Sequence, residues 1–151
     1  MATDSLQQLE DWAAPLLAKI SPAEQRKLVR SIALDLRKRQ AARIKAQQNP
    51  DGSAFAPRKP QPDRYKKPGQ IQQMFGKLRM AKRLKVLRDG QGPAVGIVGR
   101  SARIARVHQY GLRDAVQPGG KEVQYPERIL LGFTDDDAER IRDLLLEHLV
   151  G

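Results

Sequence analysis

The chain has 151 residues and a net charge of +11, with 40% hydrophobic and 30% charged residues. This length fits one domain, and the low hydrophobic share together with the high charge predicts a modest core beside long solvated helical faces or arms. Because the sequence contains no cysteine, disulfides, a thiol nucleophile and thiolate metal ligands are excluded. The N-terminus lacks the basic start and apolar run of a signal peptide, and no apolar run approaches the length of a transmembrane helix. We therefore expect an intracellular protein without membrane contact.

The first 48 residues predict a helical region made of two helices. Apolar residues recur at steps of three and four from Leu6 to Ile20, and Pro15 should kink or split this first helix. Ser21-Pro22-Ala23-Glu24 predicts the start of a second helix with a capping box. We expect this helix to run to about Gln48, a length of roughly 40 Å, and to project or to pack against neighbours. Its inward-facing residues are expected to be Leu28, Ile32, Leu36 and Ile44.

Residues 49–70 predict an extended, proline-rich basic arm. Asn49-Pro50-Asp51-Gly52 should end the second helix, because the residue before a proline avoids the helical region and Asp-Gly favours a tight turn. Four prolines and five basic residues follow between Ser53 and Gly69, a composition typical of a polyproline-like segment that packs poorly against its own subunit. We expect the arm to become ordered against a neighbour. Its interaction residues are Arg58, Lys59, Arg64, Tyr65, Lys66 and Lys67.

The next part of the chain predicts a helix and a β-hairpin. The apolar residues of 71–80 have helical spacing, and a strand is expected over 83–88. Residues 89–92 read as a hairpin loop, and 94–99 as the partner strand. A short helix over 101–109 should then stop at Gly111.

The C-terminal part predicts a loop, one short strand and a last helix. Residues 112–120 are loop-like, and Val123 and Tyr125 fit a third short strand that Pro126 halts. Thr134 caps a final helix with acidic residues in its first turn, where the helix dipole favours them. Its expected buried stripe is Ala138, Ile141, Leu144, Leu145 and Leu149.

These elements predict one α+β domain over residues 1–151. It would consist of a helical region (1–48), an extended arm (49–70) and an α+β core (71–151). We expect long N-terminal helices, a small antiparallel sheet, an acidic C-terminal helix and the proline-rich basic loop.

No set of residues has the pattern of a catalytic or metal site. His108 and His148 are the two histidines, and their distant positions match no metal-ligand spacing. We interpret His108 as a packing or hydrogen-bonding residue. The acidic run 135–137 lacks the spacing of a calcium loop and is interpreted as a helix cap, and 96–101 lacks the Gly-Lys-Ser/Thr ending of a P-loop. We therefore predict no enzyme activity, no catalytic residue, no cofactor and no metal.

The charge is distributed unevenly along the chain. Residues 26–45 and 58–88 are strongly basic, whereas acidic residues predominate over 135–147. Opposite charges at two ends allow pairing with copies of the same chain, head to tail, as readily as with DNA. Few aromatic residues lie among the cations, and no helix-turn-helix or zinc signature is present, so any DNA contact would be non-specific and through phosphates. A basic nucleic-acid-binding accessory protein is therefore the alternative to a structural subunit.

Three segments look like fixed joints of a small assembly protein: 49–52, 103–114 and 125–134. In this order and spacing they resemble the phage virion morphogenesis family, the tail-completion proteins of contractile-tailed temperate phages. The resemblance runs through nearly the whole chain, from the Leu-rich first helix to the acidic last helix.

The joint in the second segment has two expected faces. Val107 and Tyr110 lie three residues apart and should both meet the sheet, while Arg103 and Arg106 form a separate solvent or partner face. Gly111 would allow the left-handed backbone that ends the helix. We expect a structural joint of His108, Tyr110, Gly111 and Pro126, and further interaction residues Arg103, Arg106 and Arg113.

The resemblance implies a structural role without chemistry. It implies a virion protein that completes the tail at its head-proximal end and supports head–tail joining in the neck. It also implies a homohexameric ring, since contractile tails are built with sixfold symmetry, and contact with the tail terminator, tube or connector. The expected location is the virion tail or neck, after assembly in the host cytoplasm.

Overall fold

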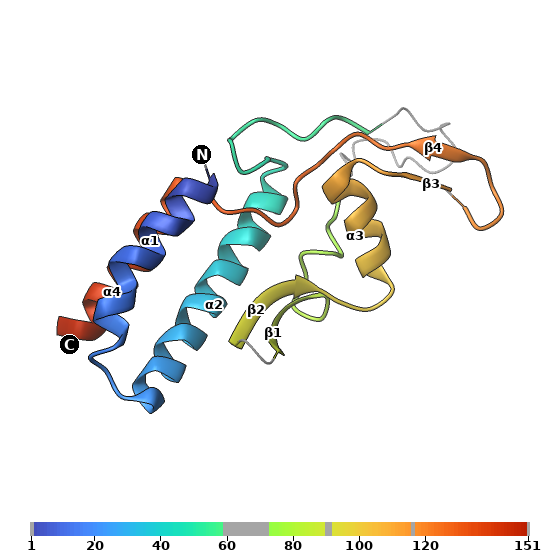
Figure 1. Ribbon diagram of the computed structural model, residues 1–151. Coiled ribbons are helices and arrows are strands. Elements are labelled where there is room, and N and C mark those ends of the chain that lie inside the picture. The colour runs from blue at the N-terminus through green and yellow to red at the C-terminus, as the bar shows by residue number, and fades with distance from the viewer. Residues whose placement is uncertain (1, 59–72, 90–91, 116, 151) are drawn as a thin grey trace.

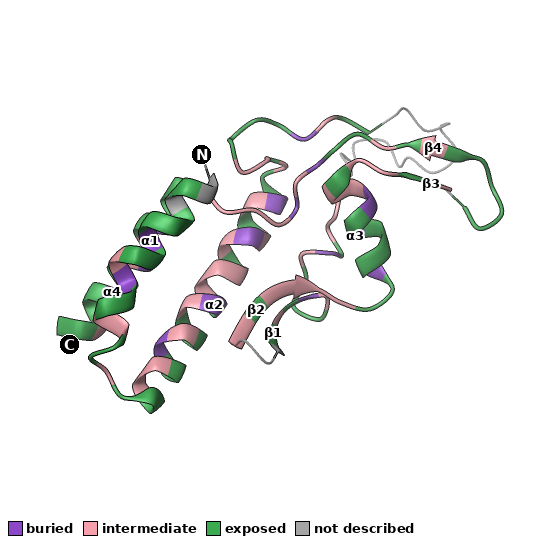
Figure 2. Cartoon of the chain, in the orientation of Figure 1, coloured by how far each residue is buried: buried purple, intermediate pink, exposed green. Residues whose placement is uncertain are grey.

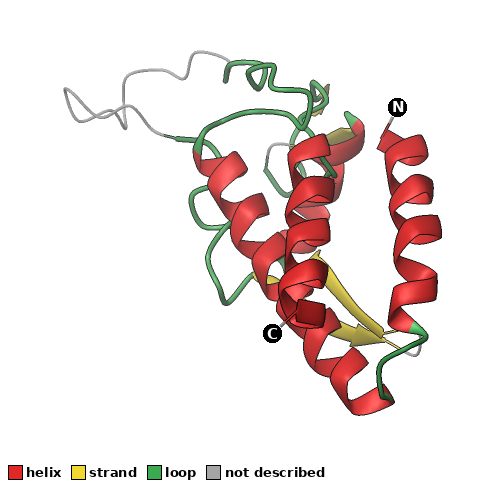
Figure 3. Cartoon of the chain, turned by 90° about the vertical axis from the view of Figure 1, so that its left-hand side faces the viewer, coloured by secondary structure: helices red, strands yellow, loops and turns green. Residues whose placement is uncertain are grey.

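The computed structural model describes residues 2–58, 73–89, 92–115 and 117–150, and in these ranges the chain forms four helices and four strands. Helices α1, α2 and α4 run side by side, and the hairpin β1–β2 and helix α3 lie on the other side of α2 (Figure 1). The short strands β3 and β4 lie beyond α3 (Figure 1). The predicted α+β fold class is confirmed, with more of the described chain in helices than in strands (Figure 3).

The first two helices begin where the sequence predicts. α1 spans Ala2–Leu17 and continues past Pro15, so this proline does not split the helix, although it removes one helical hydrogen bond; only Leu16 and Leu17 follow it within α1. α2 spans Pro22–Lys45, and the Ser21 side chain accepts a hydrogen bond from the N–H of Glu24 at 3.2 Å. It ends before Gln48 because Gln47 takes a φ of 58°, which an α-helix does not continue.

The first core cluster holds α1, α2 and α4 together. α4 spans Asp135–Val150 and is capped reciprocally, since the N–H of Asp137 donates to Thr134 Oγ1 and the N–H of Thr134 donates to Asp137 Oδ2, both at 3.0 Å. The prediction that Leu149 is buried is wrong, because it is 37% exposed at the end of the helix. The buried residues of this cluster are Leu9, Ala13, Leu28, Ala138, Ile141 and Leu145.

A second core cluster joins the C-terminal end of α2 to α3, which spans Ser101–Tyr110. Phe55 is only 5% exposed here, and its N–H donates to the carbonyl of Gln47 at 2.8 Å. The prediction that the arm packs poorly from residue 50 is therefore wrong for its first part, because a large aromatic side chain anchors it. The cluster consists of Ile44, Phe55, Leu78, Ala105 and Leu130. Residues 59–72, which hold the rest of the predicted arm, lie outside the described residues.

The hairpin forms as predicted, with β1 over Leu84–Asp89 and β2 over Gly92–Ile97, antiparallel, with Val86 opposite Val95. The expected helix over 71–80 is wrong in its described part, where residues 74–79 form turns and Phe75 takes a φ of 66°. The expected loop over 112–120 contains a strand: β3, Arg113–Ala115, pairs with β4, Glu122–Gln124. The described chain thus has two small two-stranded sheets, where the sequence suggested one.

Candidate assembly site

The three segments singled out in the sequence meet around residues 128–132, called the clamped segment below, which is neither helix nor strand. Asn49 Oδ1 accepts a hydrogen bond from the N–H of Ile129 at 2.9 Å. Gln109, on α3, accepts from the N–H groups of Leu130 and Leu131 at 2.9 Å and donates to the carbonyl of Leu131 at 2.8 Å. The side-chain amides of Asn49 and Gln109 therefore make hydrogen bonds to backbone groups of this segment, as a neighbouring strand would in a sheet. Buried backbone N–H and C=O groups need such partners.

Helix α2 holds the other side of the clamped segment. Gln40, which is 6% exposed, donates to the carbonyl of Gly132 at 2.7 Å and accepts from its N–H at 3.1 Å. Arg43 donates to the carbonyls of Ile129 and Leu130 at 2.8 and 2.7 Å. Burial lowers the pKa of Arg43, but a guanidinium stays charged in proteins. Two helices thus fix one irregular segment through its backbone.

Gly132, in the clamped segment, lies directly against Pro50, in the turn at 49–52. A Cβ on Gly132 would lie 2.2 Å from Pro50 Cγ, far inside any real contact. Only glycine fits where the clamped segment crosses the turn at 49–52.

Arg128 connects the clamped segment to the start of the arm. It is a buried arginine, 4% exposed, that donates to the carbonyls of Ala56 at 2.7 Å and Pro57 at 3.0 Å. Its backbone N–H donates to the carbonyl of His108 at 2.8 Å. Burial and the nearby Arg58 lower the pKa of Arg128. Arg128 therefore holds residues 56 and 57 against the clamped segment.

The His108 ring lies between two aromatic rings, with centroids 4.8 Å from Phe75 and 5.0 Å from Tyr125. Its Nδ1 lies 3.0 Å from Arg128 Nη1; because a guanidinium only donates, Nδ1 accepts and the ring proton is on Nε2. Burial, followed by the charges of Arg128 and Arg58, lowers the pKa of His108 from 6.5 to about 4. The imidazole is neutral at neutral pH and acts as a packed ring.

Gly111 ends α3 in the left-handed conformation, with φ 60° and ψ 52°. A Cβ there would lie 3.1 Å from the backbone N of Glu127. The chain passes here from α3 into β3, and the antiparallel β3–β4 hairpin brings Tyr125 and Arg128 back to His108. Pro126, in the returning segment, is exposed.

The expectation that Tyr110 packs on the sheet is wrong, because its side chain is 65% exposed. At about 100° per residue, Tyr110 lies closer around α3 to Arg103 and Arg106 than to buried Val107. Arg103 pairs with Asp114 at 2.6 Å, and this arginine lowers the pKa of the Asp114 carboxyl. The exposed α3 face is defined here as Arg103, Arg106, Tyr110 and the neighbouring Arg113.

Of the interaction residues expected on the arm, the structure describes only Arg58, which is exposed. Lys59, Arg64, Tyr65, Lys66 and Lys67 lie outside the described residues.

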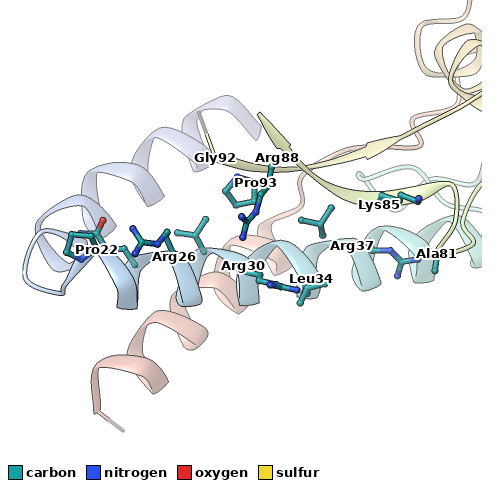
Figure 4. A pocket seen from close by; sticks show the side chains of 13 residues that line it. Pro22, Arg26, Arg30, Leu34, Arg37, Ala81, Lys85, Arg88, Gly92 and Pro93 are labelled. Carbon is teal, nitrogen blue, oxygen red and sulfur yellow. The ribbon is translucent and has the colours of Figure 1, made fainter. Parts of the chain in front are cut away.

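A groove of about 950 Å³ runs between α2 and the β1–β2 hairpin, and we call it the basic groove (Figure 4). Among the residues that the structure describes, five cations line it and no acidic residue does. Apolar side chains between them include Val29, Leu34, Val86 and Pro93. The sequence indicated the basic helix and the hairpin, but not that the hairpin packs beside the helix and makes the second wall. The cations are Arg26, Arg30, Arg37, Lys85 and Arg88.

Sequence reasoning assigned no role to Gln40, Arg43, Gln109 or Arg128. One signal was present for Gln40: it lies four residues after Leu36 and four before Ile44, within the apolar stripe of α2. A polar side chain on a buried stripe needs a hydrogen-bond partner inside the protein. Nothing comparable marks Arg43 or Gln109, whose partners are distant backbone groups.

Among the described residues, no three histidine or acidic side chains are grouped so that they could hold a metal ion. The helices of the described chain include none that is long and apolar enough to cross a membrane. The glycine-rich stretch 96–101 begins at the end of β2, where a Cβ on Gly96 would lie 2.9 Å from Leu87 Cδ1. Close packing within the hairpin therefore accounts for Gly96.

The clamped irregular segment, the packed histidine and the exposed cationic faces fit a structural assembly protein. The model of the phage virion morphogenesis family matches residues 4–150, and the chain belongs to this family. It is similar to the tail completion protein S of Escherichia phage P2, with 36% identity over 148 residues that cover 97% of this chain and 98% of that protein. No solved structure matches the chain.

Family membership confirms the resemblance and the prediction that the protein is not an enzyme. Its role is structural, in tail completion during phage virion morphogenesis.

Proposed function

We propose that this protein completes the phage tail at its head-proximal end and supports head–tail joining. The observation that carries the proposal is the exposed α3 face. Arg103, Arg106 and Tyr110 lie on α3, which Gln109 ties to the clamped segment, and Arg113 follows at the start of β3. A rigid base holding exposed arginine and tyrosine side chains is typical of protein interfaces. The protein would act in the virion tail or neck, after assembly in the host cytoplasm.

The proposed partners are copies of the same chain and neighbouring neck proteins. Subunits around a tail axis meet through heterologous contacts that close by rotation, so a homohexameric ring fits a sixfold tail. The exposed α3 face and the arm residues Arg58 to Lys67 would then contact the tail terminator, tube or connector. The region boundary at 49 is revised in this proposal: the arm begins at Arg58, because Phe55 belongs to the core and Arg128 binds the carbonyls of Ala56 and Pro57.

Complementation tests this function. A phage whose own copy of the gene is deleted would be supplied with the chain in trans, and joined virions, separate heads and separate tails would be counted by electron microscopy. We expect separate heads and tails without the chain and joined virions with it. Joined virions in the absence of the chain would overturn the proposal. A chain lacking residues 59–68 should keep its thermal stability and fail to join heads to tails.

A nucleic-acid-binding accessory role is the second candidate, and the basic groove favours it. Of its cations, Arg26, Arg30, Lys85 and Arg88 form no ion pair with any described residue. Phosphate contacts through these four would give duplex binding that weakens steeply with salt, without sequence preference. Titrating labelled duplexes of two unrelated sequences at two salt concentrations measures both properties.

A further inference from the structure

The basic groove has the chemistry of a docking site for an acidic helix. Its cations lie along both walls, with Arg26, Arg30 and Arg37 on α2 (Figure 4). From Pro22 to Arg37 the α2 wall is about 22 Å long at 1.5 Å per residue. The floor between the charges is apolar, and Leu34 remains 44% exposed. Such a surface fits a partner that is both anionic and apolar along one side.

Helix α4 presents such a side to solvent. Its exposed residues recur at helical spacing, with acidic side chains first and apolar ones toward the end of the helix. Leu146 is 47% exposed and Val150 is 87% exposed, although neither is needed at the core. The stripe is about 21 Å long, close to the length of the groove wall. We call it the acidic stripe, and it consists of Asp136, Glu139, Asp143, Leu146, Glu147 and Val150.

The groove and the stripe of one chain cannot meet each other. α4 contacts α2 through Glu24, Asp35 and Arg39, which pair with His148 at 3.1 Å, Arg140 at 3.4 Å and Asp137 at 2.6 Å. At roughly 100° per residue these three positions lie on the opposite side of α2 from Arg26 and Arg30. Figure 1 likewise places α4 and the hairpin on different sides of α2. A stripe that fills the groove must come from another chain.

We propose that the basic groove binds the acidic stripe of a second copy of this chain. The inference rests on the self-assembly proposed above and names its two surfaces. Because the surfaces are different and lie on opposite sides of α2, the contact is heterologous, so each subunit offers one of each to its neighbours and a ring closes by rotation. Individual exposed ion pairs are weak, so the apolar floor and the repetition around the ring must contribute.

Charge reversal in two separate chains tests the proposal. One variant carries R26E and R30E in the groove, and the other carries E139K and D143K on the stripe. All four residues are exposed, so both variants should fold, which circular dichroism would verify. A matched control reverses Lys19 and Lys38, which are exposed and do not line the groove. Sedimentation at low ionic strength measures the self-association of each chain.

We expect wild type and control to associate, and each reversed variant to weaken association at least tenfold. An equimolar mixture of the two variants should associate again, because each reversed groove then meets a reversed stripe, and each native groove a native stripe. Wild type that stays monomeric at low salt, or a mixture that stays dissociated, would overturn the proposal. Loss of duplex DNA binding by R26E/R30E with unchanged association would assign the groove to DNA instead.

Complementation separates this inference from the proposed function. If the reversed variants lose association yet still join heads to tails, the groove–stripe contact is dispensable. That result would refute the inference and leave the proposed function supported. If the wild-type chain associates as expected but deletion of its gene leaves virions intact, the proposed function is refuted and the groove–stripe contact is supported.

Discussion

The two halves of helix α2 carry similar basic residues and use them differently. In the C-terminal half, Arg39 pairs with Asp137 and Arg43 donates to backbone carbonyls of the clamped segment. In the N-terminal half, Arg26 and Arg30 line an open groove. Figure 2 shows the difference as buried and half-buried positions toward one end of α2 and more exposed ones toward the other. Arginine therefore acts as internal scaffold at one end and as surface charge at the other, which composition alone does not reveal.

The largest expected effect comes from the internal end. Arg43→Met should lower the free energy of unfolding by about 2–4 kcal/mol, because it leaves buried carbonyls of the clamped segment without partners. Arg30→Met, on the same helix and exposed, should change it by no more than about 0.5 kcal/mol. Urea denaturation of both variants measures the contrast. Equal effects would abolish the distinction between the two halves of α2.

Gly111→Val tests the close approach between the end of α3 and Glu127, next to the clamped segment. The variant should lose about 2–3 kcal/mol, because a β-branched residue resists the left-handed backbone and its Cβ meets Glu127. Gly119 also has a positive φ, of 75°, but a Cβ there meets nothing within 4 Å. Gly119→Val should therefore cost less, through backbone strain alone. Thermal unfolding of the pair isolates the packing contribution, and a Gly119 variant as unstable as the Gly111 variant would disprove it.

His108 predicts a pH dependence of stability. Its pKa falls from 6.5 to about 4 in the folded chain, so between these values the unfolded chain binds more protons. This contribution to stability is complete above the unfolded pKa and is lost as the pH falls toward 4. The loss is on the order of 1–2 kcal/mol, since solvent partly screens a half-buried ring.

His108→Gln removes this titration, so the stability difference between wild type and variant should shrink from pH 7 to pH 4. Urea denaturation at several pH values follows it, and a constant difference would refute the assigned pKa. At neutral pH the variant should still support head–tail joining. A folded, assembling variant without function would point to chemistry at this residue.

The smallest effect on stability is expected at the exposed α3 face. Replacing Arg103 and Arg106 with alanine should leave the free energy of unfolding nearly unchanged, because exposed pairs such as Arg103–Asp114 contribute little. Head–tail joining should nevertheless weaken, since the change removes the proposed partner contacts. Plaque titre beside the unfolding curve measures both. Unchanged head–tail joining would show that the interface is not the exposed α3 face, and would assign it to the arm or the basic groove.

The sequence by itself determined the elements whose causes are local. The Ser21 cap, the Thr134 cap, the β1–β2 hairpin and the stop of α3 at Gly111 follow from neighbouring residues, and the structure contains all four. The resemblance of three segments also sufficed to indicate the family, because motif order and spacing are properties of the chain itself.

Tertiary contacts decided the rest. Phe55 is buried, so the start of the expected arm belongs to the core. Phe75 has a left-handed φ where helical spacing predicted a helix. Tyr110 pointed outward because burial depends on which side of α3 meets the rest of the fold. The clamped segment and the basic groove both depend on residues distant in sequence, such as Gln40 with Gly132 and α2 with the hairpin. Local preference cannot encode such pairings, since they arise only when separate elements pack.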